Sequence, residues 1–137
     1  MKILDITSLE QAIKTLRESL ERLKRDDESF IKDSVIKRFE YTYELCHRLF
    51  KRYLEVASPG VTDLDGMVFQ TLVRTANEMG MFKGDWSKWK KYRDARNITS
   101  HTYSEEKADQ VVRVAYEFYD EAEYFLNKRK EKLTEMH

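Results

Sequence analysis

One short segment holds the densest group of polar side chains that could do chemistry. Residues 93–103 read Arg-Asp-Ala-Arg-Asn-Ile-Thr-Ser-His-Thr-Tyr and fall at the end of a predicted helix. Asp94, Asn97 and His101 are spaced three and four residues apart, so they share one face while the helix continues. Arg93 and Arg96 lie on an overlapping face. This segment is therefore the first candidate for a functional site.

The residue types in this segment suit the recognition or cleavage of a phosphodiester. A histidine such as His101 can give or take a proton near neutral pH. An arginine such as Arg96 offers a planar fork of donors for phosphate oxygens and for the charge that develops during cleavage. With RNA, the 2′-hydroxyl can act as the internal nucleophile, so no metal is needed. The alternative is structural: a helix end that carries a dipole-matching histidine and a solvated arginine.

Helix geometry restricts how Arg96 and His101 can work together. Residues five positions apart are separated by about 140° on an unbroken helix. Within one chain, the two side chains align only if the helix ends or unwinds near Ser100. Two copies of the chain that meet across a dimer axis would remove this restriction.

The other reactive residues are weaker candidates. Cys46 and His47 are neighbours in the middle of a predicted helix, where adjacent side chains point about 100° apart. The imidazole would therefore not reach the thiol, and we expect His47 to be a structural residue. The third histidine, His137, is the last residue and is a poor candidate. One cysteine and two widely separated histidines then remain, which is poor support for a metal site. The expectation is no metal and no cofactor.

Composition narrows the class of protein. The 137 residues contain 25 Lys and Arg and 25 Asp and Glu, so a polycation that coats nucleic acid by bulk charge is excluded. Aromatic residues make up 12%, which is too many for a disordered chain. No apolar run is long enough for a membrane span. The lone Cys46 cannot form an internal disulfide, and the first residues lack a secretory pattern. These features predict a cytoplasmic protein with one domain, residues 1–137.

Hydrophobic periodicity predicts helices throughout. The expected helices cover residues 9–25, 28–55, about fifteen residues before Gly80, residues 86–100, and a long stretch that carries apolar residues 108–126. A break at 58–60 and a loop at 61–66 separate the second and third helices, and residues 128–132 read as a solvated end. Ser8 with Gln11 fits a capping box, while Asp85 and Ser104 are expected to cap later helices.

These elements predict an all-α, up-and-down bundle of four to five helices. The apolar stripes on the second and fifth helices are wide for a small isolated bundle. A homodimer that buries part of them is therefore a reasonable hypothesis.

The polar segment resembles the signature of a known family. Residues 96–103 match the R-x4-H-x-Y motif of HEPN-domain proteins, most closely the branch of nucleotidyltransferase substrate-binding proteins, also described as HepT-type toxins. Residues 38–45, Arg-Phe-Glu-Tyr-Thr-Tyr-Glu-Leu, and the approach to the motif through Arg93 and Asp94 are also similar. The resemblance covers most of the chain, from about Leu9 to Leu126.

The resemblance implies a dimeric helical bundle in which the two motifs face a shared cleft. Active members are metal-independent endoribonucleases. By this likeness Arg96 would hold the scissile phosphate, His101 would act in acid–base catalysis, and Asn97 would orient the site. The usual partner is a minimal nucleotidyltransferase encoded nearby, which in the toxin–antitoxin branch adenylylates the motif tyrosine, here Tyr103.

Three hypotheses about function follow. The first is a ribonuclease toxin with RNA as its substrate. The second is a non-catalytic substrate-binding subunit that binds nucleotide or presents a substrate to the transferase. The third is a plain structural helical dimer.

Overall fold

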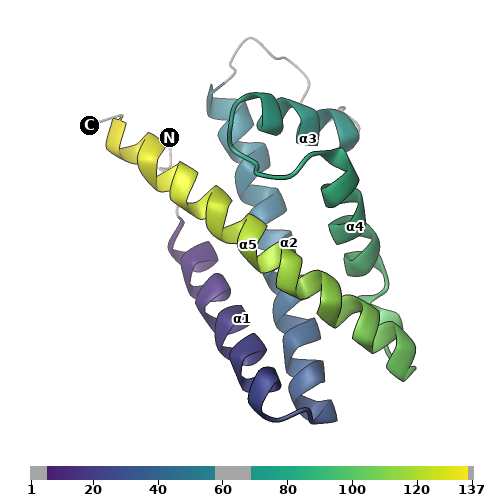
Figure 1. The fold of residues 1–137 in the computed structure, drawn as a ribbon. Helices are drawn as coiled ribbons and strands as arrows, with labels where there is room; N and C mark the ends of the chain where they lie inside the picture. The colour runs from purple at the N-terminus through teal and green to yellow at the C-terminus, as the bar shows by residue number, and fades with distance from the viewer. Residues whose placement is uncertain (1–5, 58–68, 136–137) are drawn as a thin grey trace.

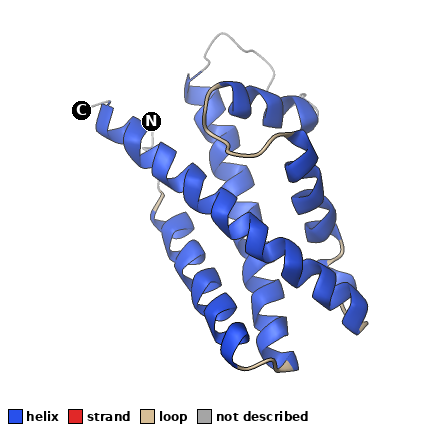
Figure 2. Ribbon diagram, viewed as in Figure 1, coloured by secondary structure: helices blue, strands red, loops and turns tan. Residues whose placement is uncertain are grey.

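The computed structural model describes residues 6–57 and 69–135, and within them it contains helices and loops but no strand (Figure 2). This confirms the predicted all-α class. None of the described helices is both long enough and apolar enough to cross a membrane. The elements in chain order are α1 (Thr7–Arg25), α2 (Ser29–Ala57), α3 (Phe69–Glu78), α4 (Trp86–Asn97), the short 3-10 helix η1 (Thr99–His101) and α5 (Glu105–Glu135).

The two N-terminal helices form an antiparallel hairpin, and α5 runs diagonally across it (Figure 1). The helix α4 lies on the opposite side of α2 from α1, with α3 at the upper end of the molecule in that view. Arg38 ties the hairpin together, because its Nη1 donates to the Thr15 carbonyl at 2.7 Å. The helix α2 is thus the central element, packed against α1, α4 and α5.

The apolar stripes predicted from the sequence are buried within a single chain. Every residue of the two overlapping stripes on α2 is at most 9% exposed, and most of the stripe on α5 is equally covered. The width of these stripes is therefore explained by neighbours in the same chain and does not require a second copy. The α2 residues are Ile31, Val35, Ile36, Phe39, Tyr43, Cys46, Leu49, Phe50 and Tyr53.

An aromatic cluster around Trp89 joins α4 to the rest of the bundle. The Trp89 side chain is fully buried and stacks on Phe82 with ring centroids 4.3 Å apart. Phe50 of α2 and Phe118 of α5 present their edges to the same indole at 5.9 Å each. Because rings from three parts of the chain meet here, the cluster fixes both the position and the rotation of α4.

Several predicted helix ends are confirmed. Asp85 caps α4 by accepting the N–H groups of Ser87 and Lys88, and the Ser104 hydroxyl accepts the N–H of Lys107 at the start of α5. Gly80 ends α3 with φ of 77°, a backbone conformation that favours glycine.

Other predicted boundaries are wrong. The first helix starts at Thr7 after Ile6, which makes no side-chain cap, so Ser8 lies inside the helix and forms no capping box. The fourth helix stops at Asn97 instead of continuing to Ser100. The described part of α3 has 10 residues, and the expected Val68 lies outside the described ranges, as do the break at 58–60, the loop at 61–66 and His137.

The predicted solvated end at residues 128–132 is also wrong in part. The helix α5 continues through this segment, and Arg129 is only 2% exposed. Its guanidinium lies 4.8 Å from the centre of the Tyr53 ring on α2, a cation–π contact that sequence spacing does not reveal.

A buried carboxylate fixes the turn before α4. Both oxygens of Glu121, on α5, accept backbone N–H groups, from Lys83 at 2.8 Å and from Gly84 at 2.7 Å. The backbone at Gly84 lies so close to Glu121 and Lys88 that an added Cβ would be 2.7 Å from Glu121 Oε1 and 2.9 Å from the Lys88 Cβ. The turn therefore requires glycine for lack of space.

Gly84→Ala should lower the free energy of unfolding by about 1–3 kcal/mol, the usual cost of overpacking. The reason is that the anchored Glu121 and the start of α4 would both have to shift. Urea unfolding followed by circular dichroism measures the effect. Lys83→Ala, which changes an exposed side chain on the same turn, serves as the control and should stay within about 0.5 kcal/mol of the parent. Equal stability of both variants would contradict the close approach.

Candidate functional site

The backbone changes from an α-helix to a narrower 3-10 turn just after Arg96 and Asn97, and this turn shapes the candidate site. The α-helical pattern of α4 ends at Asn97, and residues Thr99–His101 form a 3-10 turn. The Thr99 hydroxyl lies 2.8 Å from both the Arg96 carbonyl and Glu40 Oε2, so its one proton is shared between an acceptor in α4 and an acceptor in α2. The helix therefore ends before Ser100. This meets the condition under which Arg96 and His101 of one chain can align.

Arg96 is anchored by two carboxylates of α2. Its Nε and Nη2 donate to Glu44 Oε1, the Nε at 2.9 Å, and its Nη1 lies 3.8 Å from Glu40 Oε2. The two glutamates are four residues apart, so they occupy one face of α2 and receive the guanidinium together. The side chain of Arg96 is 30% exposed, and its partner Glu44 is 50% exposed.

Glu40 connects this ion pair to the turn. Its Oε2 lies 2.8 Å from the Thr99 hydroxyl, and its Oε1 accepts from Lys37 Nζ at 3.1 Å. Burial raises the pKa of Glu40, but these hydrogen bonds and the positive charges of Lys37 and Arg96 outweigh burial, so the pKa is lowered overall. Glu40 thus remains a carboxylate that links α2 to both Arg96 and Thr99.

The remaining residues of the motif face solvent. His101 and Asn97 are exposed, and Tyr103 is 87% exposed. Within the described residues, the Tyr103 ring has a cation–π contact with Lys107, whose Nζ lies 5.9 Å from the centre of the ring. The imidazole of His101 and the phenol of Tyr103 are therefore both accessible to a large substrate or to another protein.

Two predicted supporting residues are engaged elsewhere. Asp94 forms an ion pair with Lys90 at 3.0 Å. The guanidinium of Arg93 lies over Trp86 at 5.1 Å and over Phe69 at 5.7 Å. The structure thus brings Arg93 to the aromatic residues of α3 and α4, and it brings Arg96 to the glutamates of α2.

Sequence reasoning did not assign Glu40, Glu44 or Thr99 to the site. The two glutamates fall within the stretch 38–45 that resembles the family, and their spacing of four was a readable signal. The position of α4 along α2 could not be predicted from the sequence, because it depends on the packing of Trp89 against Tyr43 and Phe50.

A shallow pocket adjoins the turn. It has a volume of about 290 Å³ and lies between α2 and η1, with Lys37 and Glu40 on one side and Thr99, Ser100 and Thr102 on the other. Backbone and hydroxyl groups of the motif thus line an open surface that a polar ligand can reach.

The Cys46–His47 pair is structural, as expected. Cys46 is fully buried, and burial raises the pKa of its thiol, which disfavours the reactive thiolate. The His47 ring stacks on Tyr43 and meets the edges of Phe50 and Phe69, and burial lowers its pKa. Among the described residues, no group of three or more His, Cys, Asp or Glu side chains is arranged to hold a metal ion.

These features define an all-helical bundle that carries one polar segment suited to phosphate chemistry at the end of α4. The chain belongs to the family described as nucleotidyltransferase substrate binding protein like, which matches residues 4–131. The family confirms the resemblance drawn from the motif.

A curated relative and a solved structure, both from Haemophilus influenzae, are similar to this chain over most of their length. The protein named probable ribonuclease HepT is 36% identical over 108 residues, which span 76% of this chain and 73% of the relative. A solved structure, described as the fold of a substrate binding domain of a nucleotidyltransferase, aligns with a TM-score of 0.84 and 30% identity. That alignment covers 90% of this chain and 98% of the other.

Glu40→Gln should change how stability depends on pH. A carboxyl whose pKa is lower in the folded than in the unfolded chain stabilises the fold above its ordinary value near 4.5, and this stability disappears as pH falls through the lowered pKa. The difference in unfolding free energy between the parent and Glu40→Gln should therefore shrink with acidification. Urea titrations across the acid range measure it.

Thr99→Val is the matched variant for this test. It keeps the Glu40 carboxylate but removes the hydroxyl that hydrogen-bonds to it, so it should lose part of the same pH dependence. A difference between the parent and Glu40→Gln that is constant across the acid range would contradict the assignment.

Proposed function

We propose that the protein is a metal-independent endoribonuclease that acts as the toxin of a toxin–antitoxin pair, with a minimal nucleotidyltransferase as its partner. The observation that carries this proposal is the tight turn after α4, which leaves His101 exposed directly beyond the anchored Arg96. The similarity to probable ribonuclease HepT supports the same activity.

The proposed reaction uses a nucleophile that RNA itself supplies. The 2′-hydroxyl attacks the adjacent phosphorus while the bond from phosphorus to the 5′-oxygen of the next nucleotide breaks. The products are a 2′,3′-cyclic phosphate and a 5′-hydroxyl. An imidazole such as that of His101 removes the proton from the nucleophile or delivers one to the leaving oxygen. Arg96 stabilises the charge on the non-bridging oxygens, and the adjacent Asn97 helps to orient the RNA.

The ion pair of Arg96 is compatible with this role. A phosphate would compete with Glu44 for the same N–H donors. Glu44 is half exposed, and ion pairs of this kind contribute only about 0–1 kcal/mol, so a phosphate can displace it at small cost. Glu40 is the better held of the two carboxylates and would keep the guanidinium aimed at the turn.

A second copy of the chain would complete the site. General acid and general base are two roles, and each copy offers one motif imidazole. Large hydrophobic side chains remain exposed on α2 and beside the motif: Phe30 at 65%, Tyr41 at 54% and Tyr103 at 87%. Exposed aromatic residues are enriched at interfaces, so these three side chains support a homodimer.

A second candidate function is a non-catalytic substrate-binding subunit of the transferase. The observation in its favour is that Arg96 is already matched by two carboxylates in a chain whose net charge is zero, which weakens general attraction for RNA. In this function, the exposed Tyr103 and the pocket beside Thr99 would present a substrate or a nucleotide to the partner. The family to which the chain belongs supports a nucleotidyltransferase partner in both cases.

His101→Ala should abolish RNA cleavage without affecting the fold. Loss of a general acid or base slows a reaction by about 10²- to 10⁴-fold, and His101 is exposed, so thermal unfolding should be unchanged. Single-stranded RNA incubated with the protein in EDTA at neutral pH and analysed on a denaturing gel provides the measurement. Ser100→Ala, at an exposed neighbour, should cut RNA like the parent. If the parent protein leaves RNA intact under these conditions, the nuclease function is wrong and the binding subunit is favoured.

Tyr103 should accept AMP from ATP bound to the partner: the phenol oxygen loses its proton and attacks the α-phosphorus, and pyrophosphate leaves. The Tyr103 phenol is exposed and two residues from His101, so a nucleotide attached there would add negative charge and bulk beside the catalytic pair. Incubation with the transferase, ATP and magnesium should add the mass of AMP, and peptide mass spectrometry should place it on Tyr103. Tyr41→Phe, at another exposed tyrosine, should be modified normally. Modification that persists in Tyr103→Phe would contradict this assignment.

A further inference from the structure

Two arginines of α4 differ in how far their charges are balanced. Arg96 is held by two carboxylates of α2. The Nη2 of Arg93 lies 4.0 Å from one carboxylate, that of Asp94, which is too far for a hydrogen bond. Asp94 itself lies closer to Lys90, at 3.0 Å. Arg93 is 38% exposed, so its charge is the less neutralised of the two and can be reached from solvent.

Two aromatic rings hold the Arg93 guanidinium in place. Its central carbon lies 5.1 Å from the centre of the Trp86 ring and 5.7 Å from the centre of the Phe69 ring. The two rings contact each other edge to face at 5.7 Å. The Nε of Arg93 is buried and has no hydrogen-bond partner in the described part of the chain. Arg93 is therefore oriented by aromatic contacts and not by an opposing charge.

Arg93 and Arg96 lie beside the same edge of α2. Residues three apart are neighbours on the surface of a helix. Tyr43 of α2, which packs on Trp89, is affected by both: burial raises the pKa of its phenol, and the charges of the two arginines oppose this rise. A strand that contacts Arg96 can therefore also reach Arg93.

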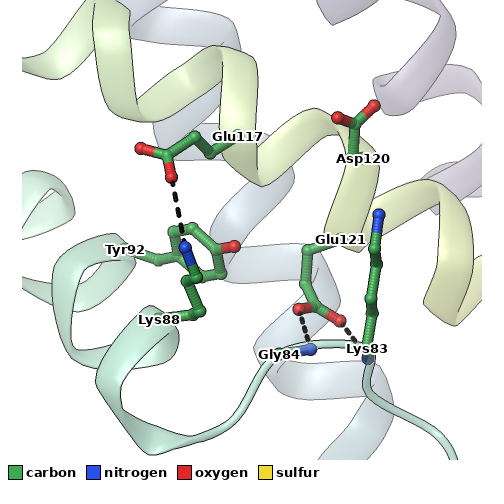
Figure 3. Close-up of a pocket in the computed structure, with 7 residues that line it drawn as sticks. All are labelled: Lys83, Gly84, Lys88, Tyr92, Glu117, Asp120 and Glu121. Atoms are coloured by element: carbon green, nitrogen blue, oxygen red, sulfur yellow. Dashed lines mark hydrogen bonds and ion pairs between the residues drawn. The ribbon is translucent and has the colours of Figure 1, made fainter.

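The opposite side of α4 is unsuited to a polyanion. Three carboxylates of α5 line a shallow pocket there, against two lysines (Figure 3). The Nζ of Lys88 lies 3.8 Å from Glu117, so one of the two lysines is already matched. The negative charge on this side would repel phosphates, which leaves the Arg93 side of α4 as the favourable path.

We propose that Arg93 binds a backbone phosphate of RNA next to the scissile phosphate held by Arg96. This inference rests on the proposed function, and it extends the RNA site from the motif toward Phe69 and Trp86. Phosphates repeat at every nucleotide of a strand, and a guanidinium offers two parallel donors to phosphate oxygens. Because Arg93 is oriented in advance and little neutralised, it makes the first strong contact. Arg96 follows when a second phosphate displaces Glu44.

Binding of an uncleavable RNA tests this subsite separately from catalysis. A fluorescein-labelled 2′-O-methyl hexanucleotide lacks the nucleophilic hydroxyl, and fluorescence anisotropy measures its binding to the full chain across a salt series. Arg93→Gln should weaken binding about ten-fold or more. The dependence of log affinity on log salt should also become shallower by about 0.7, the contribution of one phosphate in a single strand. Arg25→Gln, at an exposed residue that ends α1, should leave both values unchanged.

The salt dependence separates phosphate binding from a structural role. If Arg93 only supported the fold, its loss would lower affinity without changing the number of phosphates neutralised. Arg93→Lys provides a second variant, and thermal unfolding checks that both variants are folded. Lysine keeps the charge and therefore the salt dependence of the parent. It lacks the planar fork, so its affinity should lie between those of the parent and Arg93→Gln.

The proposal is overturned if Arg93→Gln binds the hexanucleotide with the affinity or the salt dependence of the parent. It is also overturned if a hexaglutamate peptide binds through Arg93 while the hexanucleotide does not bind, since the surface would then serve an acidic protein. The proposed function fails separately. A parent protein that binds the hexanucleotide through Arg93 but leaves unmodified RNA intact keeps this subsite and loses the nuclease activity. Cleavage that requires His101, with no effect of Arg93→Gln on binding, keeps the nuclease activity and loses the subsite.

Discussion

The packing of aromatic rings around Trp89 is the constraint on which the rest of the structure depends. The indole is fully buried and contacts rings of α2, of the turn before α4 and of α5. A helix fixed in this way cannot rotate without disrupting contacts on every side. The face that carries Arg96 is therefore directed at α2, and the face that carries Tyr92 is directed at α5. One buried residue thus fixes which face of α4 meets each of its neighbours.

The motif region combines a rigid support with accessible functional groups. Glu40 and Thr99 bind Arg96 and the turn to α2, while His101 and Tyr103 extend into solvent. This division is compatible with the proposed RNA substrate, because the arginine is oriented in advance and the histidine can be approached from outside. It also places the tyrosine where another protein can reach it.

Much of the fold could be predicted from the sequence, because apolar spacing directly records which side of each helix is buried. The stripes of α2 and α5 and the caps at Asp85 and Ser104 illustrate this. The end of α4 was missed because the 3-10 turn that follows it is joined to α2 by the contact between the Thr99 hydroxyl and Glu40, which the spacing within α4 does not show. Arg129 was missed because a charged residue near a chain end normally faces water. In both cases the residue contacted lies on α2, far away in the sequence, so the spacing within one helix does not reveal the contact.

The same distinction applies to the candidate site. The residues of the motif were found from their types and spacing, but the carboxylates that hold Arg96 come from a helix more than fifty positions earlier. The complete burial of Cys46 has one practical consequence for studying this arrangement. It is the single cysteine of the chain, so the native protein presents no accessible thiol to labelling reagents. A cysteine introduced at an exposed position, such as Ser100→Cys, would be the one reactive site for a spin label, and distances between two labels would report how copies of the chain assemble.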